Sequence, residues 1–239
     1  SSVTGSEQRR KLQHFLSDLA LLGSLQGFKY FQPWLRGKEE LLLTVVNEDL
    51  VEPPRVSLTN CSAGKCFRHT LLTLSLNWLS PAVSLPQEMN CTLFLLAGYV
   101  RYGRPYAWIR SNHERLVNIG GTDSMVKDTP MKLKSITDWQ TRGVRVWDVV
   151  SELVCLCTIP SPSNPFALDM RYIRNLPLPD RFLATGALLN FLEIFLLSVV
   201  EEVKPLRRLH VQCLLELQRH REGPGSTGSP TVHDSSGGE

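Results

Sequence analysis

Short apolar segments between Glu40 and Ile119 constrain the fold of this chain more than any other feature. They are rich in leucine, threonine and β-branched residues, and turn residues such as Pro53-Pro54 and Ala63-Gly64 separate them. No stretch of helical periodicity lies between them, which favours direct antiparallel pairing over crossover helices. We therefore expect a central antiparallel sheet with these strands: Leu41–Val46, Arg55–Thr59, Phe67–Leu79 and Thr92–Tyr102.

A helix is predicted before the sheet, over Ser6–Gly23. Its apolar residues recur at the spacing of one buried helical face, and they are Leu12, Phe15, Leu16, Leu19 and Leu22. We expect Ser6 to cap the first turn and Gly23 to end the helix in a left-handed conformation.

Helices are also predicted after the sheet. An amphipathic pattern begins at about Val144 and ends before the prolines at 160, 162 and 165. Asp180 is expected to cap a further helix that runs to about Lys204, where Pro205 interrupts it. A last helix covers Leu206–Arg221.

The sequence therefore predicts an α+β fold with an N-terminal helix, a central antiparallel sheet and a C-terminal helical segment packed on it. We divide the chain into residues 1–159, with the first helix, the sheet and the following helix, and residues 160–222, with a proline-rich linker and the C-terminal helices. Residues 223–239 are rich in glycine, serine and proline and are expected to be a disordered tail.

Charge is distributed unevenly along the chain. The total is only +3, which argues against a protein that coats polyanions along its whole surface. The segment Tyr99–Arg145, however, holds nine Lys or Arg and four Asp or Glu, a net +5, so the rest of the chain carries −2. Any anionic partner is therefore expected to bind this segment.

The first part of that segment, Tyr99–Arg110, reads as a hairpin that turns at Gly103-Arg104. Strand alternation places Val100, Ala107 and Ile109 on one face. The other face then carries Tyr99, Arg101, Tyr106, Trp108 and Arg110.

Rings and guanidinium groups on one strand face are typical of a site for single-stranded nucleic acid. Bases stack on the rings, at about 1–3 kcal/mol per base, while the cations hold phosphates. We assign stacking to Tyr99, Tyr106 and Trp108, and phosphate contacts to Arg101, Arg104 and Arg110. Two alternatives stay open: the rings are buried beneath a helix, or they form a hot spot for a protein partner.

A second unusual stretch, Phe182–Val200, has nineteen residues and one charge, Glu193. Its length permits a membrane span, but a central ionised carboxylate costs about 2.5–3.5 kcal/mol there. A helix that is apolar all round is equally the central helix of a domain. We expect it to be buried, with a membrane contact or a partner interface as alternatives, and the residues assigned to such a contact are Phe182, Asn190, Glu193 and Phe195.

The chain shows no pattern that indicates catalysis. It has no nucleophile elbow, phosphate-binding loop, dinucleotide fingerprint or zinc-protease helix. A set of possible metal ligands exists, Cys61, Cys66 and His69 with Cys91 or His113, but its spacing lacks the second matched pair of zinc sites. We therefore expect no enzyme, no metal and no cofactor.

The six cysteines are too few for a disulfide scaffold, and Cys155 and Cys157 lie in an apolar run. We expect reduced thiols and an intracellular protein, cytoplasmic or nuclear, and leave membrane association open. The chain begins at Ser1 with no secretory segment after it, which is typical of a processed product or an excised fragment.

From these features we predict a non-enzymatic interaction or assembly protein that binds single-stranded nucleic acid, either RNA or DNA, through the basic and aromatic hairpin. One alternative is a membrane-associated structural protein anchored by residues 182–200. The other is a subunit of an obligate protein complex, in which protein partners or a second copy of the chain occupy the same surfaces.

Overall fold

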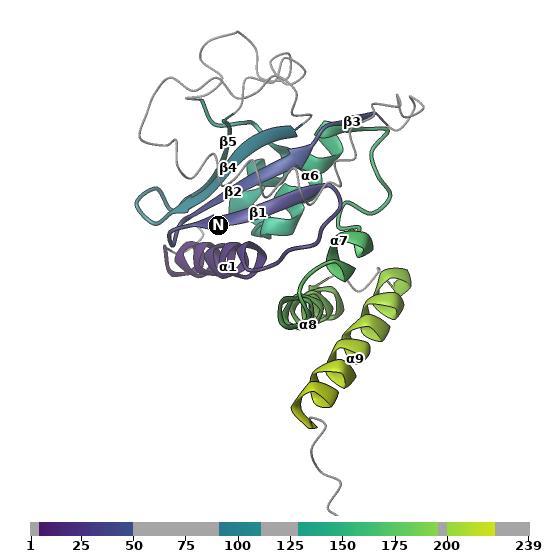
Figure 1. Cartoon of the computed structure of the whole chain (residues 1–239). Coiled ribbons are helices and arrows are strands. Elements are labelled where there is room, and N and C mark those ends of the chain that lie inside the picture. Colours follow the sequence, from purple (N-terminus) through teal and green to yellow (C-terminus); the bar gives the residue numbers. More distant parts are fainter. Residues whose placement is uncertain (1–4, 50–90, 111–128, 196–199, 223–239) are drawn as a thin grey trace, which may run out of the picture.

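A computed structural model describes residues 5–49, 91–110, 129–195 and 200–222 (Figure 1). Two of the predicted strands, Arg55–Thr59 and Phe67–Leu79, lie outside these residues, as does the predicted tail 223–239. The elements in chain order are α1 (Gly5–Gly23), β1 (Phe31–Arg36), β2 (Glu40–Val46), β3 (Glu48–Asp49), β4 (Cys91–Tyr99), β5 (Arg104–Ile109), α4 (Lys134–Thr137), α5 (Trp139–Arg142), α6 (Val146–Cys157), β6 (Thr158–Ile159), α7 (Met170–Arg174), α8 (Leu178–Phe195) and α9 (Val200–Glu222).

The sheet is antiparallel, as the sequence predicts. Within the described residues its strand order is β1-β2-β4-β5. Pro33 in β1 and Pro105 in β5 both lie on edge strands, where a missing N–H removes no ladder hydrogen bond from the centre of the sheet. A short parallel pair joins β3 to β6.

Helices α1 and α6 cover one face of this sheet, and the core lies between the layers (Figure 1). Strand residues on this inner face, such as Leu41, Phe94 and Ala107, are fully buried. They pack against the predicted stripe of α1, in which Phe15, Leu19 and Leu22 are buried as well. The predicted α+β architecture, with a helix before the sheet and helices after it, is confirmed.

Both ends of α1 differ from the prediction. Ser6 lies inside the helix rather than at its cap, since the helix already includes Gly5. Gly23 is its last residue, but it is not among the glycines with positive φ. A Cβ at Gly23 would lie 2.9 Å from the Cβ of Leu35, so close packing against β1 requires this glycine.

The C-terminal helices also begin and end at other residues than predicted. Asp180 does not cap α8. It lies in the first turn of this helix, where its negative charge interacts favourably with the helix dipole. Pro205 lies inside α9 and does not separate two helices. Because proline has no N–H, one i→i−4 hydrogen bond of α9 is missing at Pro205, yet the helix continues through it.

The two parts that we separated at residue 159 contribute to the same core. Phe166 and Phe191 pack edge-on against rings of the first part, Phe28 and Trp147, at centroid distances of 6.0 Å. The buried cluster is continuous from α1 through the sheet to α8 and α9. The boundary at 159 itself stays a prediction.

Among the helices in the described part of the chain, none combines the length and apolarity that crossing a membrane requires. Helix α8 is buried through Leu188, Phe191 and Leu192, and it packs along α9 (Figure 1). The described cysteines, Cys91, Cys155, Cys157 and Cys213, form no disulfide with one another. Cys61, Cys66, His69 and His113 lie outside the described residues.

Candidate binding surface

The predicted hairpin exists, but its turn lies earlier than the sequence suggests. Strand β4 ends at Tyr99 and β5 begins at Arg104, its cross-strand partner. The amides of Tyr102 and Gly103 both donate to the carbonyl of Tyr99 at 3.0 Å, and Gly103 has a φ of 66°. Val100 is therefore a turn residue that is 64% exposed, rather than a member of the buried face with Ala107 and Ile109.

Helix α1 holds the tip of this hairpin in place. The side-chain amide of Gln8 donates to the carbonyl of Gly103 at 3.2 Å. Behind the hairpin, Gly98 lies against α1, where a Cβ would come within 3.0 Å of Leu16 and Phe15. The absence of a side chain at Gly98 lets β4 approach α1 closely.

Alternation predicts the two faces of β5 correctly. Ala107 and Ile109 are buried on the inner face, whereas Tyr106, Trp108 and Arg110 are half-buried on the opposite one, which we call the outer face. Arg101 lies in the turn instead of on a strand, and like Arg104 it is exposed.

Four rings meet at the hairpin end of the outer face, and we call them the ring cluster: Tyr99, Tyr102, Tyr106 and Trp108. Tyr106 and Trp108 stack at 5.5 Å with an interplanar angle of 24°. Tyr102 meets Tyr99 and Tyr106 edge-on at 6.0 and 6.1 Å. Tyr102 is also the most accessible ring of the cluster, at 57% exposure.

Each predicted arginine lies over a ring of this cluster. Arg101 lies 5.7 Å from the centroid of Tyr102, and Arg104 lies 5.3 Å from that of Tyr106. Arg110 lies 5.5 Å from the centroid of Trp108. The surface therefore presents planar cations next to planar rings, both of which can stack on a base.

The carboxylate of Glu40 holds Tyr99 of the ring cluster in place. The Tyr99 hydroxyl donates to Glu40, whose other oxygen lies 3.4 Å from Nε of Arg36. Burial, followed by this hydrogen bond, raises the pKa of Tyr99 to about 12 from its usual 10.0. Tyr99 therefore stays protonated and acts as a hydrogen-bond donor at neutral pH.

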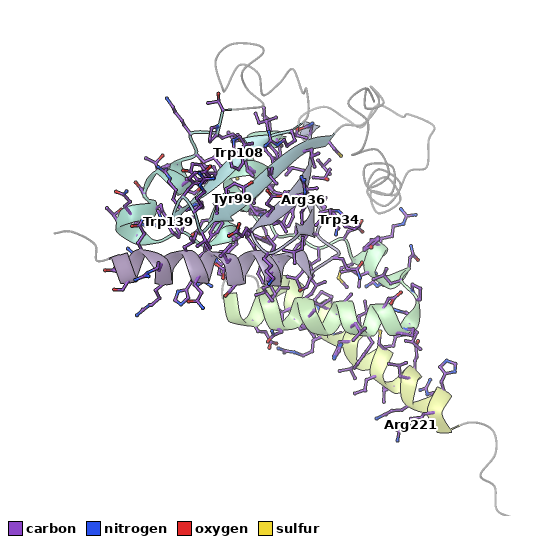
Figure 2. The ribbon with its side chains drawn as sticks, turned by 90° about the vertical axis from the view of Figure 1, so that its left-hand side faces the viewer. Trp34, Arg36, Tyr99, Trp108, Trp139 and Arg221 are labelled. Atoms are coloured by element: carbon purple, nitrogen blue, oxygen red, sulfur yellow. The ribbon has the colours of Figure 1, made fainter. Side chains whose placement is uncertain are left out.

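Sequence reasoning missed several residues of the outer face. Trp34 and Arg36 lie on it and belong to β1, a strand that we did not predict. The register aligns Trp34 with Leu42, Leu95 and Trp108 across the sheet, so Trp34 shares the face of Trp108. Figure 2 shows Trp34, Arg36, Tyr99 and Trp108 together on the sheet. Their signal was the alternation of Phe31–Arg36 before the Gly37-Lys38 turn.

The residues predicted for a membrane or partner contact on α8 face two directions. Phe182 stacks on His210 of α9 at 4.7 Å, and Glu193 pairs with Arg207 of α9. Asn190 is exposed, and the side chain of Phe195 lies outside the described residues. Two of the four therefore contact α9 of the same chain.

These features define the class of the protein as an α+β domain with an antiparallel sheet, helices on one face of it and a ring cluster on the other. Residues 80–220 match the model of a domain family of unknown function, DUF7886. The match spans more than half of the chain, so the chain belongs to this family. It includes the hairpin and α8, and all but the end of α9. No curated protein and no solved structure matches the chain.

Proposed function

We propose that the chain binds single-stranded nucleic acid through the hairpin Tyr99–Arg110, as an interaction or assembly protein without catalytic activity. The observation that carries this proposal is the ring cluster with its three overlying guanidinium groups on the sheet face opposite α1 and α6. Unpaired bases can stack on such a surface, whereas the bases of a duplex are already stacked on each other.

Stacking and phosphate contacts would both contribute to binding at this surface. Stacking contributes about 1–3 kcal/mol per base, so bases on Tyr102 and Tyr106 would together supply about 2–6 kcal/mol. Arg101 and Arg104 are exposed at the hairpin tip and can reach phosphates on either side of the stacked bases. Stacking shows little preference among bases, so we expect weak sequence specificity.

The experiment is fluorescence anisotropy with labelled uridine and thymidine oligonucleotides of about twelve residues, at several salt concentrations. Replacement of the exposed ring, Tyr102→Ala, is expected to weaken binding about tenfold while the fold is retained. Arg101→Gln and Arg104→Gln are each expected to reduce the salt dependence by about 0.7 in the log–log slope.

Two control variants separate this surface from general effects. Val100→Ala changes an exposed apolar residue of the same turn, and Arg208→Gln removes the same charge from α9. Both are expected to bind like the parent chain. The proposal fails if neither oligonucleotide binds at low salt, or if Tyr102→Ala binds as tightly as the parent chain.

A further inference from the structure

Helix α9 has two opposite apolar sides, and within the described residues only one of them is buried against the rest of the chain. Leu206, Leu209 and Cys213 are buried and face α8. Val211, Leu214 and Leu215 are 49%, 41% and 48% exposed. At 3.6 residues per turn these three lie on the side of α9 opposite to the buried set.

Cations flank the exposed apolar side at both ends. Lys204 and Arg208 precede it, while Arg219 and Arg221 follow it, and all four are exposed. Figure 2 shows Arg221 at the end of α9 that points away from the sheet. Acidic residues stand at the two ends of α9, Glu201, Glu202 and Glu222, while Glu216 inside the helix lies 3.9 Å from Arg181 of α8.

From this arrangement we propose that the exposed side of α9 is a docking surface for an acidic amphipathic helix of a partner protein. The partner's apolar stripe would cover Val211, Leu214 and Leu215, as in other helix–helix recognition. Its Asp and Glu residues would lie opposite the cations at both ends, which gives orientation and fast association. The surface is distinct from the hairpin, so the proposal does not depend on nucleic-acid binding.

The charges argue against a second copy of this chain as the occupant. In an antiparallel pair of α9 helices centred on Leu214 and Leu215, Arg208 of one copy lies opposite Arg221 of the other. In a parallel pair, every cation lies opposite itself. Like charges at such positions destabilise helix pairing, whereas an acidic helix relieves the repulsion.

The size of the apolar side argues against a lipid surface. Helices that lie in a membrane interface carry a long apolar face with large residues along it. Among the side chains of α9 that the structure describes, the exposed large apolar ones stand at positions 211 to 215, and the other apolar side is packed on α8. A short apolar patch between charged ends fits a protein helix better.

The test uses the full chain and a labelled synthetic peptide of about three heptads with leucine at a and d, glutamate at e and g, and alanine elsewhere. Its anisotropy is expected to rise with added chain and to report saturable binding. The variant Leu214→Gln/Leu215→Gln is expected to bind at least about tenfold more weakly. A peptide with lysine in place of glutamate is expected to lose at least as much.

The control variant is Leu183→Gln, which replaces an even more exposed leucine, 67%, on α8. It is expected to bind like the parent chain, and circular dichroism checks that all variants keep their helices. The proposal is wrong if the acidic peptide does not bind, or if the double variant binds it as well as the parent chain does.

Two further measurements on the same variants test whether a second copy of the chain or a membrane binds this surface instead. Sedimentation velocity that shows a dimer of the parent chain, lost in the double variant, assigns the surface to a second copy and overturns the proposal. Cosedimentation with phosphatidylserine vesicles that is lost in the double variant assigns it to a membrane and overturns it as well. Absence of both, together with selective binding of the acidic peptide, supports it.

Discussion

The ion pair between Asp18 of α1 and Arg145 before α6 joins the two helices that cover the sheet. Arg145 donates to the carboxylate through Nε at 2.7 Å and Nη2 at 2.8 Å, and the amide of Val146 lies 3.5 Å away. The side chain of Asp18 is 6% exposed, but that of Arg145 is 46% exposed. The Asp18 hydrogen bond is also the main cause of a raised pKa of Arg145.

This difference in exposure predicts unequal effects of the two single substitutions. Arg145→Ala leaves a buried carboxylate without its main partner, which costs about 3–5 kcal/mol in fully buried pairs. We expect a smaller cost than in a fully buried pair, about 2–3 kcal/mol, because the space that Arg145 vacates reaches solvent. Asp18→Asn keeps the volume and leaves a half-exposed arginine over Trp147 at 4.0 Å, so about 1–2 kcal/mol is expected.

The double variant Asp18→Asn/Arg145→Ala tests whether Arg145 compensates the buried charge of Asp18. In the parent chain Asp18→Asn destabilises the fold, but in the Arg145→Ala background it removes an unpaired buried charge. We therefore expect it to stabilise that variant by about 1 kcal/mol. Urea unfolding followed by far-UV circular dichroism measures all four chains, and Arg142→Ala, an exposed arginine nearby, serves as control with a change below about 0.5 kcal/mol.

The reasoning is refuted if Asp18→Asn lowers stability by the same amount in both backgrounds. That outcome would mean that Arg145 contributes nothing to the environment of the carboxylate. It is also refuted if Arg145→Ala and Arg142→Ala cost equally little, because the pair would then behave as an ordinary exposed ion pair.

Three further predictions concern Tyr99, its partner Glu40, and two glycines with positive φ. The fold raises the pKa of Tyr99 to about 12, so the stabilisation that comes from the protonated Tyr99 hydroxyl is complete below pH 10 and is lost between pH 10 and 12. In urea unfolding, Tyr99→Phe should therefore lose less stability over that range than the parent chain does. Glu40→Gln should lower the pKa of Tyr99 toward 10 in an absorbance titration of the phenolate. Gly27→Ala should cost more than Gly37→Ala in urea unfolding, by about 1–3 kcal/mol, because both glycines have positive φ but only at Gly27 would a Cβ lie 2.7 Å from Ile173.

The parts of the fold that depend on local pattern are predictable from the sequence. The stripe of α1 and the alternation of Tyr106, Ala107 and Trp108 follow from helical and strand periodicity, which the residues carry individually. The turn of the hairpin was misplaced because strand alternation says nothing about where a strand ends. Tyr102, the most exposed ring of the cluster, was omitted from the predicted site for the same reason.

The parts that depend on register between distant segments are not predictable in this way. Trp34 reaches the row of Trp108 only because β1, β2 and β4 pair with one particular alignment. The carboxylate that fixes Tyr99 lies 59 residues away in the sequence, and that which holds Arg145 lies 127 residues away. Such pairs leave no signal at either position alone.

The number of apolar sides on a helix nevertheless indicates how many neighbours it packs against. Residues 182–195 are apolar on nearly all sides because α8 packs against the core through Leu188 and Phe191 and against α9 through Phe182. Even its glycine serves this packing, since a Cβ at Gly186 would lie 3.1 Å from the His210 ring. The same argument applied to α9 finds two apolar sides, of which one is buried against α8 and the other is exposed within the described residues. If each apolar side of α9 is covered, as those of α8 against the core and α9 are, then α9 has a second partner. The cations around Leu214 and Leu215 indicate that this partner is acidic.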